Sequence, residues 1–162
     1  MYGVIGYGNA LRRDDGAGLV LAQEIAALLA RKGQRVLHRL VHQLTPELIY
    51  EFVEAECIIF VDTGVADDDP MVCVTPVLSQ GEARTVGHQM APEMFLVLLE
   101  KFLNIFPPAW MVRVPGWDFC FGEEISTKTK HALMCFLKQL EQDWQSVFNI
   151  HHDCVMIQKG GL

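Results

Sequence analysis

Apolar residues follow two different periods along the chain, and the two periods alternate. Short runs that are almost wholly apolar are typical of strands buried on both faces of a parallel sheet. They occupy residues 2–6, 35–42, 57–62, 71–78 and 109–114. Longer segments repeat their apolar residues every three or four positions, as an amphipathic helix does. They occupy residues 18–32, 45–55, 91–104 and 126–150.

The order of these segments predicts an α/β fold. Strands that alternate with helices build a three-layer α/β/α sandwich around a mostly parallel sheet, here of roughly five strands. In the commonest small arrangement of this kind, the first strand lies between the second and the third, and ligands bind beyond the carboxyl ends of the first and third strands. For 162 residues, we expect one domain over residues 1–150 and a loose C-terminal tail over residues 151–162.

The composition of the chain limits the kinds of partner that we expect it to bind. The chain is 51% hydrophobic and 20% charged, as a globular domain is, and its net charge of −7 disfavours nucleic acid as a partner. No apolar run reaches the roughly 18 residues of a membrane span, and no basic leader precedes the first strand. The five cysteines form no CxxC pair, which fits free thiols in a reducing cytoplasm. We therefore expect a cytoplasmic protein that binds neither membranes nor nucleic acids.

The loop between the first strand and the first helix reads GYGNALRRDDGAG over residues 6–18. Its glycines permit a sharp turn, as in loops that bind phosphate. Two observations argue against a dinucleotide site: Leu11 stands where the GxGxxG motif has its third glycine, and no acidic residue ends the second strand. Asp14 and Asp15 would also repel a phosphate. The acidic pair favours a cation instead.

Three segments that this fold brings to one end of the sheet carry candidate metal ligands. Asp14 and Asp15 follow the first strand, Asp62 ends the third strand, and His88 lies just before a helix. Two carboxylates and an imidazole with open coordination positions suit a borderline ion such as nickel or zinc. Purely structural interpretations stay open: Asp14 as a helix cap, Asp62 as a turn residue, and His88 as a surface histidine.

The same segments resemble a known family. GYGNALRRDDGAG, then IIFVDTG, then GHQM before a helix are similar, in order and spacing over about residues 3–148, to the hydrogenase maturation endopeptidases. The resemblance implies that Asp15, Asp62 and His88 bind the metal and take part in catalysis, while Asp14 caps or braces the loop. The other loop-supporting residues in this pattern are Gly6, Gly8, Asn9, Gly16 and Gly18.

Members of this family trim the C-terminus of the large subunit of nickel–iron hydrogenases. The resemblance thus implies a nickel-dependent endopeptidase whose partner is the nickel-loaded large-subunit precursor, with the nickel supplied by that precursor. HQLTPEL at residues 42–48 replaces a glycine-rich stretch of many relatives, and it resembles the subgroup that serves bidirectional, NAD-reducing hydrogenases. Cleavage could use metal-polarised water or a carboxylate as general base.

A nickel-binding chaperone that cuts nothing is the alternative function, and it would use the same three ligands. Such a chaperone would be expected to carry a histidine-rich tract. HHDC at residues 151–154 is too short to provide one. We expect this segment to be part of an exposed tail, and the sequence assigns it no role.

Overall fold

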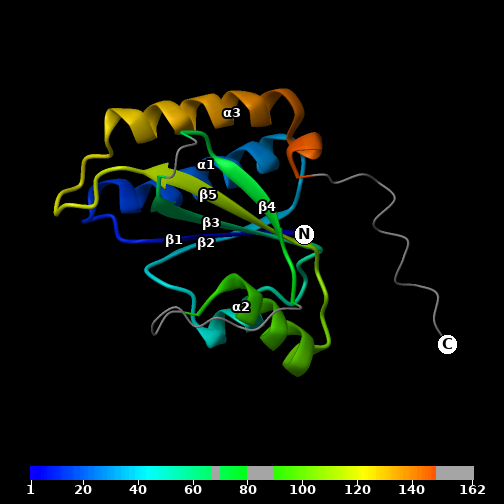
Figure 1. Ribbon diagram of the computed structural model, residues 1–162. Helices are drawn as coiled ribbons and strands as arrows, with labels where there is room; N and C mark the ends of the chain where they lie inside the picture. The colour runs from blue at the N-terminus through cyan, green and yellow to red at the C-terminus, as the bar shows by residue number, and fades with distance from the viewer. Residues whose placement is uncertain (67–69, 80–89, 149–162) are drawn as a thin grey trace.

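The computed structural model describes residues 1–66, 70–79 and 90–148. Within them, five strands form one sheet in the order β2-β1-β3-β5-β4 (Figure 1). The strands are Tyr2–Tyr7 (β1), Val36–Val41 (β2), Cys57–Val65 (β3), Cys73–Val77 (β4) and Ala109–Gly116 (β5). Neighbours pair in parallel except for β4, which runs antiparallel to β5 at one edge. The predicted fold class is confirmed, and so is the position of β1 between β2 and β3.

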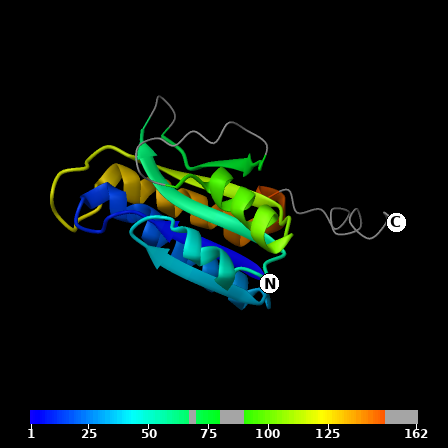
Figure 2. The same cartoon turned by 90° about the horizontal axis from the view of Figure 1, so that it is seen from below.

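Helices cover both faces of this sheet and complete the three layers. On one face lie α1 (Ala17–Arg31) and α3 (Thr127–Val147). On the other lie the 3-10 helix η2 (Pro46–Glu51), α2 (Pro92–Leu98) and the π-helical turn η3 (Leu99–Leu103). Figure 2 looks onto the α2 side, with α3 behind the sheet. None of the helices in the described ranges is long and apolar enough to cross a membrane.

The central strands contribute side chains to two separate hydrophobic cores, one on each face of the sheet, because successive residues of a strand point to opposite faces. On β3, Ile59 and Val61 pack with α1 and α3, whereas Ile58 and Phe60 pack with α2. All four side chains are fully buried. A strand that is buried on both faces needs an unbroken apolar run, which is why the sequence pattern identified β3 clearly. Asp62 follows Val61, so by the same alternation its side chain points toward the α2 side, like those of Ile58 and Phe60.

Strand β3 is longer than predicted, so Asp62 does not end it. Residues 63–65 continue the strand because they pair with Val114, Pro115 and Gly116 of β5. The apolar run stops at Val61, which hides this extension from the sequence pattern. Asp62 therefore lies inside the ladder, where pairing with β5 fixes its backbone.

The two predicted helices on the α2 side are less regular than expected. The segment 45–55 forms only the 3-10 helix η2, and the Thr45 side chain does not cap it, although Pro46 takes the first helical position. The helix predicted over 91–104 becomes π-helical at Leu99 and stops at Asn104, whose backbone is left-handed with φ 54°. The predicted tail, with its HHDC segment, lies outside the described residues, so the division of the chain stays a prediction.

The carboxylate of Asp14 holds together the loops at one end of the sheet. Asp14 is fully buried and accepts five hydrogen bonds from the loop after β5 and the start of α3. The donors are the backbone N–H groups of Trp117, Asp118 and Ser126 and the hydroxyl groups of Ser126 and Thr129, at 2.6–2.9 Å. Asp14 thus braces three segments, and it does not cap α1, whose N-terminus has no side-chain cap.

These hydrogen bonds keep a buried carboxyl ionised. Burial alone would raise the pKa of Asp14, but the backbone N–H groups of Ser126, Trp117 and Asp118 outweigh burial, so the pKa lies below its ordinary value. A carboxyl whose pKa is lowered on folding stabilises the fold above its unfolded pKa. That contribution is lost as the pH falls through the lower, folded value.

Replacing Asp14 by alanine should cost about 3 kcal/mol or more of unfolding free energy, because five donors lose their acceptor. This exceeds the roughly 0.5–2 kcal/mol of a lost helix cap. Asp143→Ala is the matched control: Asp143 is exposed and accepts one hydrogen bond, from the N–H of Ser146 at 3.0 Å, so its loss should cost less than about 1 kcal/mol. Urea denaturation at neutral pH measures both changes, and equal losses would contradict the bracing role of Asp14.

Candidate functional site

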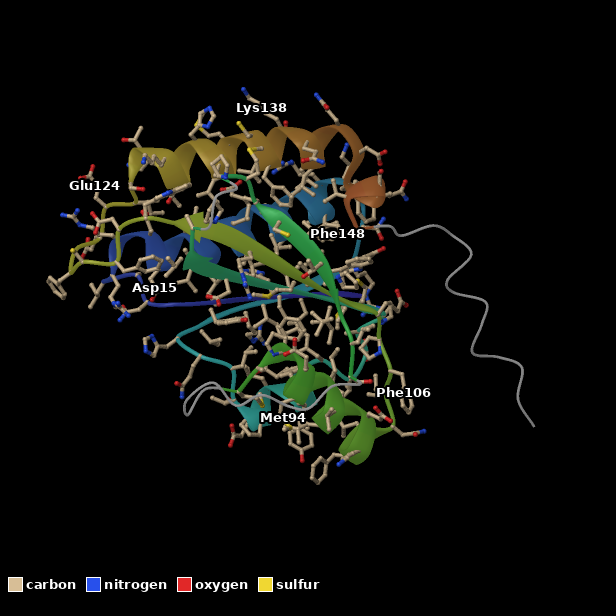
Figure 3. All side chains as sticks on the ribbon, viewed as in Figure 1. Asp15, Met94, Phe106, Glu124, Lys138 and Phe148 are labelled. Atoms are coloured by element: carbon tan, nitrogen blue, oxygen red, sulfur yellow. The ribbon has the colours of Figure 1, made fainter. Side chains whose placement is uncertain are left out.

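The candidate site lies at the carboxyl ends of β1 and β3. The 3-10 turn η1 (Arg13–Gly16) follows β1 and carries Asp15, while Asp62 comes from β3 itself. Figure 3 shows Asp15 at the end of the sheet from which the loop of Glu124 projects, away from Phe106 and Phe148. The strand order changes direction between β1 and β3, and ligands of open α/β sheets bind at this point.

The turn after β1 is shaped around Asp15. Gly8 has a φ of 149°, and the carbonyl oxygen of Asp15 occupies the space that a side chain at position 8 would need, so only glycine fits. The N–H of Asn9 donates a hydrogen bond to Oδ2 of Asp15 at 2.9 Å. The side chain of Asn9 in turn accepts one from the N–H of Leu11 at 2.9 Å. One oxygen of this half-buried carboxylate is therefore tied to its own loop.

Helix α1 approaches the sheet closely beside Asp62. A methyl group on Gly18 would lie 3.0 Å from the Cα of Asp62, so a larger residue would push the helix away. The N–H of Gly18 donates to Oγ1 of the buried Thr63 at 2.9 Å, which satisfies one of the free amides at the start of the helix. This contact sets η1, and with it Asp15, against β3.

Two further glycines in the loop motif serve close packing. Gly6 lies inside β1 rather than in the turn, and a methyl group on it would lie 2.5 Å from Cβ of Ala22 in α1. Gly16 ends η1, and a methyl group on it would lie 3.1 Å from Cα of Ala10. Four glycines of this motif thus have a steric reason, but only Gly8 among them has a positive φ.

The charge of Asp15 acts on Asp62. The pKa of Asp62 is raised to about 6: burial and the charge of Asp15 raise it, while the N–H of Thr63, 2.8 Å from Oδ1, and the charge of Arg113 offset part of the rise. The two carboxylates therefore lie near each other in a partly desolvated place. A shared cation would relieve their repulsion, so this donor set fits a divalent metal.

Two further polar residues, Tyr7 and Arg113, lie near Asp62, and a third, Glu93, acts on Tyr7; the sequence pattern did not single them out. Tyr7 ends β1, and burial followed by the charge of Asp62 raises its pKa. Glu93, in the first turn of α2, also raises the pKa of Tyr7. Arg113 is the register partner of Asp62 on β5. Arg113 interrupts the apolar run of its strand, and that interruption was the available signal.

The third predicted ligand, His88, lies outside the described residues, so its approach to the two carboxylates stays a prediction. Within the described ranges, no three His, Cys, Asp or Glu side chains gather as a metal-binding group. The part of the site that the structure describes thus contains two neighbouring carboxylates from the predicted set, Asp15 and Asp62. Any further ligand would have to come from outside these ranges or from a bound partner.

The fold should lose stability between about pH 4 and pH 6 because of Asp62. Its pKa is about 3.9 in an unfolded chain and about 6 in the folded protein. The folded state therefore holds this proton more tightly, and the stability that it gives below pH 4 is lost, by at most about 3 kcal/mol, as the pH rises through this range. Asp62→Asn keeps an acceptor for Thr63 but does not titrate.

Urea denaturation from pH 4 to pH 7 measures this effect. The unfolding free energy of Asp62→Asn minus that of the natural protein should increase as the pH rises, and this difference should become constant near neutrality. A difference between the two proteins that stays constant over this range would contradict the raised pKa.

No family model matches the chain, and no curated protein sequence matches it significantly, but solved structures do. The [NiFe] hydrogenase maturation protease HybD from Thermococcus kodakarensis is 20% identical, with a TM-score of 0.59 over 87% of this chain and 97% of that chain. HycI from Thermococcus kodakarensis KOD1 is 16% identical, with a TM-score of 0.64 over 87% and 90%. HybD from E. coli is 15% identical, with a TM-score of 0.60 over 90% and 92%. At these identities the likeness establishes the fold, and the chain has the fold of the [NiFe] hydrogenase maturation proteases.

Proposed function

We propose that the chain is a hydrogenase maturation endopeptidase that removes the C-terminal extension from the nickel-loaded large-subunit precursor of an [NiFe] hydrogenase. The observation that carries the proposal is the pair of half-buried carboxylates, Asp15 in the turn after β1 and Asp62 in the last part of the neighbouring parallel strand β3. Two further observations support it: the fold shared with solved maturation proteases, and the order of the three sequence motifs.

Nickel enters this reaction as part of the substrate. The precursor brings the metal, and Asp15, Asp62 and His88 add ligands to it and thereby place the scissile bond. Two carboxylates that repel each other gain from a shared cation, and an imidazole adds a nitrogen donor that suits a borderline ion such as nickel. A precursor without nickel would lack this anchor and would not be cut.

We propose water as the nucleophile of the cleavage step. The thiol of Cys57 is unsuitable, because burial raises its pKa to about 12 and keeps it protonated at neutral pH. Water can be activated through polarisation by the nickel of the substrate or by a carboxylate acting as general base. Asp62, with its pKa of about 6, is well placed for the second route, since it is mostly ionised at neutral pH yet still basic.

We also propose that processing takes place in a reducing cytoplasm. The cysteines of the described ranges are free thiols, which fits that compartment: Cys57, Cys73, Cys120 and Cys135. The HQLTPEL segment leads from the end of β2 into η2. Its resemblance to the subgroup for bidirectional hydrogenases makes the large-subunit precursor of an NAD-reducing hydrogenase the first substrate to test.

Removing any one of the three predicted ligands should stop processing. Asp62→Asn keeps the size of the side chain and removes its charge, Asp15→Ala removes the first acid, and His88→Ala removes the imidazole. Each change should lower the cleavage rate by about 100-fold or more, because each removes a group that acts on the reacting atoms. Asp15→Glu should retain partial activity, since it keeps the carboxylate. Mass spectrometry of the intact precursor measures the loss of its C-terminal extension.

Glu54→Gln is the control for these variants. Glu54 is exposed and pairs with Arg35 at the other end of the sheet, just before β2, so this change should leave processing unaltered. Cleavage by Asp62→Asn at the natural rate would contradict the proposed site. Delivery of nickel to the precursor without any loss of mass would point to a chaperone instead.

The free protein should bind nickel weakly. Three protein ligands at most leave several coordination positions open, and we expect the precursor to fill them. Calorimetric titration of nickel chloride into the protein alone checks this. Tight binding with one nickel per chain would contradict the expectation and favour the chaperone.

A further inference from the structure

Arg113 places a positive charge beside Asp62, one of the two carboxylates. It is the residue of β5 in register with Asp62 on β3, and paired residues share one face of a sheet. Its side chain is exposed, and it forms no ion pair with any residue of the described ranges. A charged residue in an apolar strand run needs a reason, and within the described ranges no ion pair supplies one.

Gly64 allows the side chain of Arg113 to lie flat on the sheet. A methyl group on Gly64 would lie 3.0 Å from Cδ and 3.5 Å from Nε of Arg113. Gly64 follows Asp62 by two residues, so both face the same side of β3. The stem of Arg113 therefore runs from its register position toward the carboxyl end of β3, which is the end at which Asp15 lies.

The charge of Arg113 acts on Asp62. Asp15 raises the pKa of Asp62 and Arg113 lowers it, so both charges act on the same group. The charge of Arg113 also partly offsets the rise in the pKa of the neighbouring Tyr7. A cation and an anion thus both act on Asp62 at this end of the sheet.

The arginines of the loop after β1 are directed elsewhere. Arg13 forms an ion pair with Asp118, and Nε of Arg12 donates a hydrogen bond to the carbonyl oxygen of Phe119 at 3.4 Å. Both therefore serve the contact between this loop and the loop after β5. Arg113 is the arginine whose charge acts on Asp62.

We propose that Arg113 is a specificity-determining residue: a resident counter-ion that keeps Asp15 and Asp62 from capturing free divalent cations until a substrate-borne metal arrives. This deepens the proposed function and rests on it for the identity of the substrate. One positive charge offsets part of the attraction of two carboxylates for a free ion. A docked precursor adds contacts of its own, which can displace the arginine. Because the stem lies on a glycine, no side chain at position 64 hinders that displacement.

Calorimetric titration of nickel chloride alone into the full chain tests the proposal. Arg113→Gln should bind nickel about tenfold more tightly than the natural protein, because a unit charge within roughly 6 Å of a divalent ion is worth about that much even in a water-like dielectric. Arg113→Lys keeps the positive charge and should bind as weakly as the natural protein. Urea denaturation midpoints establish that both variants fold.

Two controls assign the effect to this site. Arg35→Gln removes an exposed arginine at the other end of the sheet and should leave nickel binding unchanged. The double variant Arg113→Gln/Asp62→Asn should lose the gained affinity, because it removes one of the carboxylates that hold the ion. An unchanged affinity in Arg113→Gln, or a gain that persists in the double variant, would overturn the proposal.

A second measurement uses the precursor. Free nickel at a concentration that leaves processing by the natural protein unaffected should slow processing by Arg113→Gln, because the ion then occupies the carboxylates before the substrate does. The titrations contain no precursor, so they report on Arg113 whether or not the chain cuts. If the natural protein cuts the precursor but Arg113→Gln does not change the nickel affinity, the proposed role of Arg113 is overturned and the proposed function still stands.

Discussion

The candidate site depends on the buried carboxylate of Asp14. The loops after β1 and β5 meet through backbone hydrogen bonds, between Arg13 and Gly122 at 2.8 Å and between Gly122 and Leu11 at 2.9 Å. Such a loop pair leaves several donors turned inward, and the carboxylate of Asp14 accepts from five of them. This fixes the orientation of η1. Asp15 is the next residue; its carboxylate accepts from the N–H of Asn9, and its charge acts on Asp62.

The acids at this end of the sheet differ in how their charge is satisfied. Asp14 is fully buried, yet hydrogen bonds hold its pKa below the ordinary value. Asp62 is only half-buried, yet its pKa is raised, because one backbone N–H and a neighbouring arginine do not offset desolvation and the charge of Asp15. A carboxylate that accepts several hydrogen bonds supports the structure, whereas a poorly compensated one is a candidate for binding a cation or a proton. The contrast marks Asp14 as a structural acid and Asp62 as a candidate site residue from their surroundings alone.

The sequence pattern predicted the sheet and the neighbourhood of Asp15 and Asp62 for a physical reason, while the place of His88 stays a prediction. Strands buried on both faces need unbroken apolar runs, and parallel connections with one hand leave few topologies, so the meeting of Asp15 and Asp62 could be predicted. The partners of Asp14 could not, because they lie more than a hundred residues away and depend on how two loops pack. The register that sets Arg113 beside Asp62 was equally hidden, since apolar runs predict two strands but not which residues of them pair.

Asp14 and Asp15 are adjacent but lie in different surroundings. This restricts the length of the loop after β1 more than its composition. Gly8, Asn9 and Asp15 form one closed unit, in which the backbone of one end contacts the side chain and carbonyl of the other. A residue inserted before Asp14 would move Asp14 to the place of Asp15 and leave no acid in the buried place, whereas a deletion would move Asp15 to the buried place and leave Gly16 in the outer one. Related chains should therefore keep the number of residues between Asn9 and Asp14 more strictly than their identity. Insertions and deletions should occur instead in other surface loops, where no side chain has to lie a fixed number of residues from a neighbouring element.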